Sequence, residues 1–146
     1  ISMVAFDAAR DPSAFPQAGT PWQPSKLYYV GFSGERVLAL HRKFLELGLE
    51  SPFDDAWLER AKSMTKVYTT LIDVSGFGDV RRDALLAHAT QVDPESPFWF
   101  GLPPEVARTV HPVDEYILAR TTGGATVSGE GAEDDLFAGV RDPANR

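Results

Sequence analysis

Segments that favour strands alternate along this chain with segments that favour helices, and this alternation constrains the fold more than any other feature. The strand-forming segments are residues 26–30, 65–74 and 113–119, each dense in branched or aromatic side chains. Such side chains suit a pleated, half-buried surface. Alternation of strands with helices indicates an α/β fold, but about three strands with three or four helices do not complete a wound sheet. We therefore expect the sheet of this chain to be incomplete by itself.

Helical periodicity is strongest over residues 35–47. Apolar side chains recur there at steps of three and four residues, on one face of the expected helix: Val37, Leu40, Phe44 and Leu47. Gly48 stands where a left-handed C-terminal cap is favoured. A second helix is predicted from the capping signal at Ser51 and Pro52 to about Lys62, and a third over about residues 79–91.

Proline and glycine divide the remaining sequence into loops and termini. Residues 11–24 are expected to form an extended loop, and residues 94–104 form an aromatic loop with one further helical turn at Pro103-Pro104. The start of the chain has no initiator methionine, no basic region and no long apolar run, so we expect it to be cut at its front. The predicted organisation has four parts: the end of a helix at residues 1–10, an α/β lobe at 11–120, a flexible linker rich in glycine and acids at 121–135, and a docking tail at 136–146.

The composition argues against several classes of function. The net charge is −7 and the fourteen Lys and Arg residues are scattered, whereas a nucleic-acid binder normally carries a basic patch. The absence of cysteine excludes disulfides, thiolate nucleophiles and cysteine-based zinc sites. It also fits a reducing compartment, and we expect a cytoplasmic protein. No apolar run approaches the length of a membrane span, so neither a nucleic acid nor a membrane is expected as a partner.

The three histidines lack the spacing of a metal site. A histidine-based zinc site needs three or four ligands, and the sequence contains no His-x-x-His or His-Glu-x-x-His pair. His41 falls on the polar side of its helix and His111 precedes a proline in a turn. Both are therefore expected at the surface.

His88 has a different setting, because the helix predicted over residues 79–91 places it on one face with Gln91. That face carries Val80, Ala84, Ala87, His88 and Gln91. We expect this face to pack inward, where His88 and Gln91 need hydrogen-bond partners, since burying an unpaired polar group is costly. His88 is then either a structural histidine bonded to a backbone carbonyl or a histidine that faces a catalytic pocket. The spacing alone favours the structural role.

Four stretches resemble one enzyme family. Two of them are Pro21-Trp22-x-x-Ser25-Lys26-Leu27-Tyr28-Tyr29 and Asp83-Ala84-Leu85-x-Ala87-His88-Ala89-Thr90-Gln91-Val92-Asp93-Pro94. Both are similar to the PIG-L-type (LmbE-like) zinc deacetylase superfamily, and most of all to the actinobacterial mycothiol S-conjugate amidases. The opening Val4-Ala5-Phe6-Asp7-Ala8-Ala9 and the tail Glu133-Asp134-Asp135-Leu136-Phe137-Ala138-Gly139-Val140 resemble the same family. The resemblance thus runs in order over almost the whole chain.

The resemblance implies that the chain is the C-terminal portion of a Rossmann-like deacetylase fold. In that family two histidines and an aspartate of an N-terminal lobe bind zinc, and a neighbouring aspartate acts as general base. None of those motifs occurs in this sequence, so the metal ligands are expected upstream of Ile1. Zinc lowers the pKa of a bound water and polarises the amide carbonyl, and the aspartate removes the water proton. The expected reaction, a detoxification step, cleaves the amide bond of a mycothiol S-conjugate to a mercapturate and glucosaminyl-inositol. This chain alone is expected to bind no catalytic zinc and to be inactive.

The same resemblance suggests candidate site residues and partners. His88 and Gln91 become candidates for the catalytic pocket, and Lys26, Tyr28 and Tyr29 become candidates for substrate binding. The expected partners are a small-molecule thiol S-conjugate and the chain's own N-terminal lobe, or a second copy of the chain, because a severed sheet exposes an edge and part of a face. Two alternatives stay open. One is the sister deacetylase, which acts on the N-acetylglucosaminyl-inositol precursor, and the other is a non-catalytic binding module.

Overall fold

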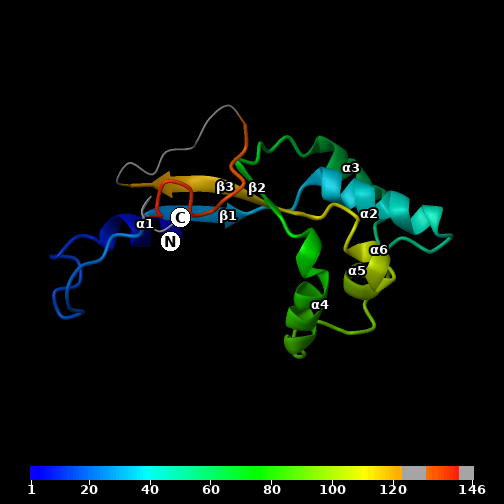
Figure 1. Ribbon diagram of the computed structural model, residues 1–146, viewed down its shortest axis with the longest axis horizontal. Coiled ribbons are helices and arrows are strands. Elements are labelled where there is room, and N and C mark those ends of the chain that lie inside the picture. The colour runs from blue at the N-terminus through cyan, green and yellow to red at the C-terminus, as the bar shows by residue number, and fades with distance from the viewer. Residues whose placement is uncertain (123–130, 142–146) are drawn as a thin grey trace. The chain divides into compact units, whose positions relative to one another are not determined.

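The computed structural model describes residues 1–122 and 131–141. Residues 1–31, 68–72 and the described residues from 115 onward form one compact unit, and residues 32–67 and 73–114 form a second. The elements in chain order (Figure 1) are α1 (Ser2–Ala8), β1 (Lys26–Val30), α2 (Gly34–Glu46), α3 (Asp55–Ser63), β2 (Thr70–Asp73), η1 (Ser75–Phe77), α4 (Gly78–Ala87), α5 (Pro97–Phe100), α6 (Pro104–Ala107) and β3 (Val113–Thr121). Helices and strands are both present, which confirms the mixed α/β class expected from the sequence.

The first unit is built on a three-stranded sheet in the order β1-β3-β2. β1 runs antiparallel to β3, with Tyr28 opposite Leu118. The amide of Thr69 donates to the carbonyl of Tyr116 at 3.0 Å and begins the pairing of β2 with β3. The strand predicted at residues 26–30 is confirmed, and the strand predicted at residues 113–119 extends to Thr121. β3 is therefore the central strand, and β1 lies at an edge of the sheet.

β2 is shorter than the strand predicted over residues 65–74, because the backbone pairing stops at Thr69. The hydroxyl of Thr69 accepts the amide proton of Leu118 at 2.7 Å, which is a donor that a longer pairing would use. The chain before Thr69 is not part of the sheet, and Val67 is 81% exposed. Branched side chains favour a strand locally, but a strand also needs backbone groups of a neighbour to pair with.

The second unit has its core between α2 and α3. Val37, Phe53 and Ala61 are buried there, and partly buried side chains pack around them: Leu38, Leu40, Leu58 and Phe98. Gly34 lets the two helices approach closely, since a Cβ atom at this position would overlap the carbonyl group of Ala61. The helix predicted at residues 35–47 is thereby confirmed as α2, and its apolar face is the face that packs.

Local capping interactions set the ends of α2 and α3. The side chain of Ser33 accepts the amide proton of Arg36 and caps α2, and Gly48 beyond its end has φ 69°, as the predicted left-handed cap requires. α3 begins at Asp55, later than the start predicted from Ser51. The reason is that Asp54 caps the helix by accepting the amide proton of Trp57 at 2.8 Å.

α4 ends at Ala87, before the end predicted at residue 91. His88 leaves helical geometry, with φ −84° and ψ 44°. Its carbonyl then accepts the amide protons of Gln91 and Val92 at 2.8 and 2.9 Å, which closes a turn. The helical turn predicted at Pro103-Pro104 is confirmed as α6, and α5 is a further short helix inside the aromatic loop.

The described tail differs from the flexible linker predicted over residues 121–135. Thr121 is the last residue of β3, and Glu133 is 2% exposed and forms a parallel bridge with Thr70. A segment rich in glycine and acidic residues is predicted to be flexible because it contributes little apolar surface to bury. Glu133 is ordered by partners that are remote in sequence. Residues 123–130 of the predicted linker and residues 142–146 of the predicted tail lie outside the described residues.

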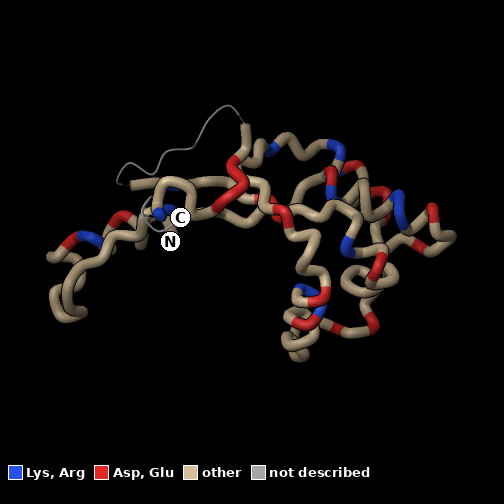
Figure 2. The backbone as a smooth tube through the Cα atoms, in the orientation of Figure 1, with Lys and Arg blue, Asp and Glu red and all other residues tan. Residues whose placement is uncertain are grey.

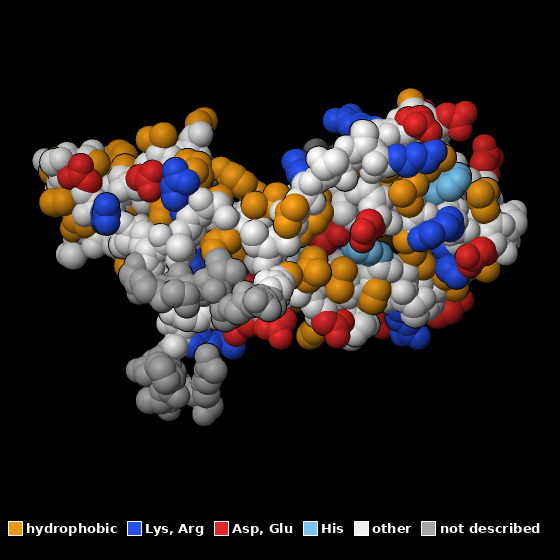
Figure 3. All heavy atoms as spheres, turned by 90° about the horizontal axis from the view of Figure 1, so that it is seen from above, with side chains coloured by type: hydrophobic (Ala, Val, Ile, Leu, Met, Phe, Trp, Pro, Cys, Tyr) orange, Lys and Arg blue, Asp and Glu red, His pale blue; other side chains and the backbone are white. Residues whose placement is uncertain are grey.

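The surface combines mixed charge with exposed apolar side chains. Acidic and basic residues are interspersed along the helices of the second unit (Figure 2), with no basic stripe in its described residues. Apolar side chains reach the surface in both units (Figure 3), and the largely exposed ones include Trp22, Val30, Phe77 and Val80. Within residues 1–122 and 131–141, no helix combines the length and apolar character that crossing a membrane needs.

Candidate functional site

Four polar side chains from distant parts of the sequence meet inside the first unit. The ammonium group of Lys26 lies 2.6 Å from Oε1 of Glu133. The hydroxyls of Tyr28 and Thr70 donate to Oε2 of Glu133 at 2.7 and 3.0 Å, and Lys26 also donates to the Tyr28 hydroxyl at 3.0 Å. The side chains of Lys26 and Glu133 are only 4% and 0% exposed. We call these four residues the Glu133 cluster.

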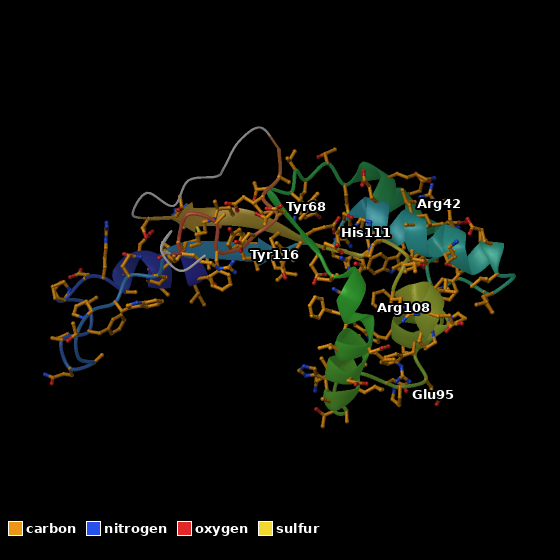
Figure 4. All side chains as sticks on the ribbon, viewed as in Figure 1. Arg42, Tyr68, Glu95, Arg108, His111 and Tyr116 are labelled. Atoms are coloured by element: carbon orange, nitrogen blue, oxygen red, sulfur yellow. The ribbon has the colours of Figure 1, made fainter. Side chains whose placement is uncertain are left out.

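Strand geometry explains how the sequence builds this cluster. Lys26 and Tyr28 are two residues apart on β1, and side chains at that spacing share one face of a strand. The Tyr28 ring packs edge-on against Tyr116 of β3, with ring centroids 6.1 Å apart, and Tyr116 is labelled on the sheet in Figure 4. Thr70 is fully buried as the first residue of β2. The sheet therefore places a lysine, a tyrosine and a threonine around one carboxylate.

Hydrogen bonds within the cluster favour the charged forms of Lys26 and Glu133. Burial alone would raise the pKa of Glu133, but hydrogen bonds from Lys26, Tyr28 and Thr70 hold that pKa below its ordinary value. Burial alone would lower the pKa of Lys26, but its bonds to Glu133 and Tyr28 raise it. Burial is also the main cause that raises the pKa of Tyr28. Near neutral pH the cluster thus holds an ionised Lys–Glu pair and a neutral tyrosine.

The structure separates the three residues proposed from the sequence for substrate binding. Lys26 and Tyr28 come together, and their polar atoms bond to Glu133. Tyr29 follows them on β1 with its side chain 44% exposed. Of the three, Tyr29 is the side chain most accessible from solvent.

Thr70 and Glu133 are not among the site residues predicted from the sequence. One signal was available, because a lysine on the inner face of a strand needs an acidic partner. No local pattern says which acid of the tail supplies it, although the structure leaves Asp134 exposed and buries Glu133. The choice depends on the parallel bridge between Thr70 and Glu133, which joins segments remote in sequence.

His88 and Gln91 lie in the second unit, and both are exposed. The inward packing predicted for their shared face is wrong, because Val80 is 64% exposed and Ala84 and Ala87 are exposed as well. The early end of α4 also removes the helical spacing between His88 and Gln91. The side-chain amide of Gln91 donates only to the neighbouring carbonyl of Thr90, at 3.0 Å. Within the described residues both side chains face solvent, and the buried residue of this turn is Val92.

A second group of charged side chains forms hydrogen bonds with the start of β3 inside the second unit. Asp114 accepts hydrogen bonds from Arg36, at 3.3 Å, and from Arg81, and Arg36 also donates to the carbonyl of Val113. Three residues earlier in the chain His111 has φ 54°, directly before a proline. A left-handed conformation at a residue other than glycine costs on the order of 1–3 kcal/mol. His111 (labelled in Figure 4) is half-buried rather than fully at the surface as predicted.

The described residues do not supply a metal site. Residues 1–122 and 131–141 contain no group of three or more His, Cys, Asp or Glu side chains arranged to hold a metal ion. His41 bonds through Nδ1 to the hydroxyl of Ser51 at 2.9 Å. The donor set around Glu133 is built from an ammonium and two hydroxyls, which suits a carboxylate and not a cation.

Comparison with curated proteins finds relatives that match nearly the whole chain. A mycothiol S-conjugate amidase of Streptomyces coelicolor is 44% identical over 150 residues, covering 99% of this chain and 49% of the relative. A 1D-myo-inositol 2-acetamido-2-deoxy-alpha-D-glucopyranoside deacetylase of Frankia alni is 33% identical, covering 96% of this chain and 49% of the relative. A deacetylase of the same name from Rhodococcus opacus is 36% identical, covering 96% and 47%. The chain therefore spans about half the length of these relatives. No family model matches the chain, and no solved structure matches it.

Proposed function

Because the chain is related over almost its whole length to a mycothiol S-conjugate amidase and to glucosaminyl-inositol deacetylases, we propose that it is part of a mycothiol-related amidohydrolase. The reaction we propose cleaves the amide bond of a mycothiol S-conjugate and releases a mercapturate and glucosaminyl-inositol. The observation that carries this proposal is the 44% identity to the amidase over 99% of the chain. The deacetylases compared above reach 33% and 36%, which favours the amidase among two activities that both hydrolyse an amide.

The catalytic metal, in this proposal, is held by another part of the enzyme. The family resemblance implies zinc, and a hydrolytic zinc site uses three protein ligands with one open position. The described residues of this chain do not fit that requirement. We propose that the ligands lie upstream of Ile1, in a Rossmann-like lobe that pairs with this one.

This chain would then supply a scaffold and part of the substrate pocket. Tyr29 of the first unit has an exposed side chain, and so do His88 and Gln91 of the second unit, so each unit by itself offers groups to a second lobe or to a substrate. Val30, next to Tyr29 on the edge strand β1, is 81% exposed, and an apolar side chain on an open edge favours association with another chain segment. We propose the enzyme's own N-terminal lobe as that segment and the cytoplasm as its location.

Turnover by the full-length protein tests the proposed reaction. We expect kcat/KM for a bulky mycothiol S-conjugate to exceed that for N-acetylglucosaminyl-inositol by at least roughly tenfold, which is about 1.4 kcal/mol of transition-state stabilisation. The reverse ratio would assign the chain to the deacetylase. If neither compound is hydrolysed by zinc-loaded protein, the chain belongs to a non-catalytic binding module.

A further inference from the structure

The Glu133 cluster has the composition of a receptor for one carboxylate. Lys26, Tyr28 and Thr70 all belong to the sheet, and all three direct a donor at Glu133. The two carboxylate oxygens have different donors: Oε1 accepts from the Lys26 ammonium, and Oε2 accepts from the two hydroxyls. Bonds of this kind, with an ionised acceptor, are roughly twice as strong as neutral ones.

The backbone of Glu133 is bound at the same place through one isolated β-bridge. The amide of Glu133 donates to the carbonyl of Thr69 at 2.8 Å, and its carbonyl accepts the amide proton of Leu71 at 2.7 Å. The bridge between Thr70 and Glu133 is parallel, and it lies on the side of β2 that β3 leaves open. The Tyr28 hydroxyl also lies 3.3 Å from the carbonyl of Leu136. The tail is thus held by both its main chain and one acidic side chain.

The neighbouring acids of the tail show that this binding is selective. Asp134 is exposed. Asp135 accepts the amide proton of Phe137 at 2.9 Å and pairs with Arg141 at 3.1 Å, both within the tail itself. Only Glu133 among these three reaches the sheet. A carboxylate removed from water in this way needs its partners in place, because an unpaired buried charge is strongly destabilising.

We propose that Lys26, Tyr28, Thr70 and the open edge of β2 form a binding site for an acidic peptide segment that bridges β2 through one residue, filled in this chain by its own tail around Glu133. Peptides that add a strand to a sheet edge gain affinity from the main chain and specificity from alternate side chains. A segment whose glutamate reaches Lys26 and whose backbone bridges Thr70 is therefore the ligand class. A peptide with the sequence of residues 131–141 binds the same site once the tail is weakened.

A peptide-binding measurement tests this site. Fluorescence anisotropy is measured with a labelled peptide of residues 131–141, added to the unaltered chain and to the Glu133→Ala chain. We expect the Glu133→Ala chain to bind the peptide with a Kd at least roughly tenfold lower than the unaltered chain does, because its own tail no longer competes. The same peptide with glutamine in place of the glutamate, and an acceptor that also carries Lys26→Met, should each weaken binding at least roughly tenfold. Asp134→Ala in the acceptor is the matched control and should behave as the unaltered chain.

Either of two results in the peptide measurement would contradict the proposal. If the folded Glu133→Ala chain and the unaltered chain bind the peptide equally, or if the glutamine peptide binds as well as the glutamate peptide, the site does not select an acidic segment. Circular dichroism establishes that the variants are folded.

Hydrogen exchange on the unaltered chain provides a test that needs no substitution. The tail can be displaced only if it opens before the sheet does. The amides of Leu71 and Glu133, which hold the tail, should then exchange together and at least roughly tenfold faster than the amide of Gly31. The Gly31 amide donates to Glu115 between β1 and β3 at 2.6 Å. Equal protection of all three amides would mean that the tail leaves only when the sheet unfolds, and the proposal would be wrong.

Discussion

The ammonium group of Lys26 and the carboxylate of Glu133 lie 2.6 Å apart, although 107 residues separate them in the sequence. Both side chains are almost completely removed from solvent. Lys26 belongs to the Ser25-Lys26-Leu27-Tyr28-Tyr29 motif and Glu133 to the acidic tail motif. Each of two motifs that look independent in the sequence therefore supplies one residue of a buried ion pair.

Removing the carboxylate should destabilise the fold strongly. Glu133→Ala leaves the Lys26 ammonium and two hydroxyl donors without their acceptor, and breaking a buried ion pair from one side costs about 3–5 kcal/mol. We expect a loss of that size in the free energy of unfolding, measured by urea denaturation. Asp134→Ala, one residue along and exposed, should change it by no more than about 0.5 kcal/mol. Equal effects of the two substitutions would contradict the role assigned to Glu133.

The stability of the protein should fall at both ends of the pH scale. The pKa of Glu133 is lower in the folded chain than its ordinary value of 4.5. The contribution of Glu133 to the free energy of unfolding is therefore complete above pH 4.5. It is lost as the pH falls through the lower, folded-state pKa. The pKa of Lys26 is raised above 10.5 and that of Tyr28 above 10.0. Their contributions are complete below those values and are lost as the pH rises through the raised pKa values.

Thermal unfolding across this pH range measures the loss of stability at acid pH and at alkaline pH. The double variant Lys26→Met/Glu133→Leu replaces the ion pair with apolar side chains, and such replacements are often neutral or stabilising. Its Tm should depend less on pH than that of the unaltered chain, both below pH 4.5 and above pH 10.5. If the Tm of the double variant falls at acid pH as much as that of the unaltered chain, carboxylates other than Glu133 cause the fall.

The sequence predicted those parts of the fold that depend on neighbouring residues. β1 was predicted to the residue, and α2 to within one residue at each end, because strand composition, helical periodicity and the Gly48 cap are local signals. The end of α4 was missed because the turn that His88 begins has no strong signature in the sequence. Of the candidate site, the sequence predicts Lys26 and Tyr28, whereas Thr70 and Glu133 depend on pairing between remote segments. Such pairing is decided by packing of the whole chain.

Adding one methyl group at Gly34 should weaken the packing of α2 against α3. A Cβ atom there would overlap the backbone of Ala61, so the helices would have to separate around their buried core. Overpacking of this kind costs about 1–3 kcal/mol, and we expect Gly34→Ala to lower the free energy of unfolding by that amount. Gly76→Ala is the matched control, since nothing lies within 4 Å of its added Cβ atom. A similar loss in both variants would point to backbone conformation and not to the helix contact.

His88→Gln separates a structural role from a pocket role in the full-length protein. The side chain is exposed in this chain, so we expect the free energy of unfolding to change by no more than about 0.5 kcal/mol. The proposed pocket role predicts that kcat/KM for the S-conjugate falls at least roughly tenfold. Thr90→Ala, another exposed residue of the same turn, is the control and should leave turnover unchanged. Normal turnover by His88→Gln would remove His88 from the pocket.

The discontinuity of the first unit sets an order of events during synthesis on the ribosome. Lys26 is made 107 residues before Glu133, which at roughly 5–20 residues per second is an interval of about 5–20 s. Residues 32–67 and 73–114, which form the second unit, are all made within that interval. The Lys26 side chain of the nascent chain therefore has no Glu133 to pair with while the second unit is being made, and the buried ion pair can form only after the acidic tail has been made.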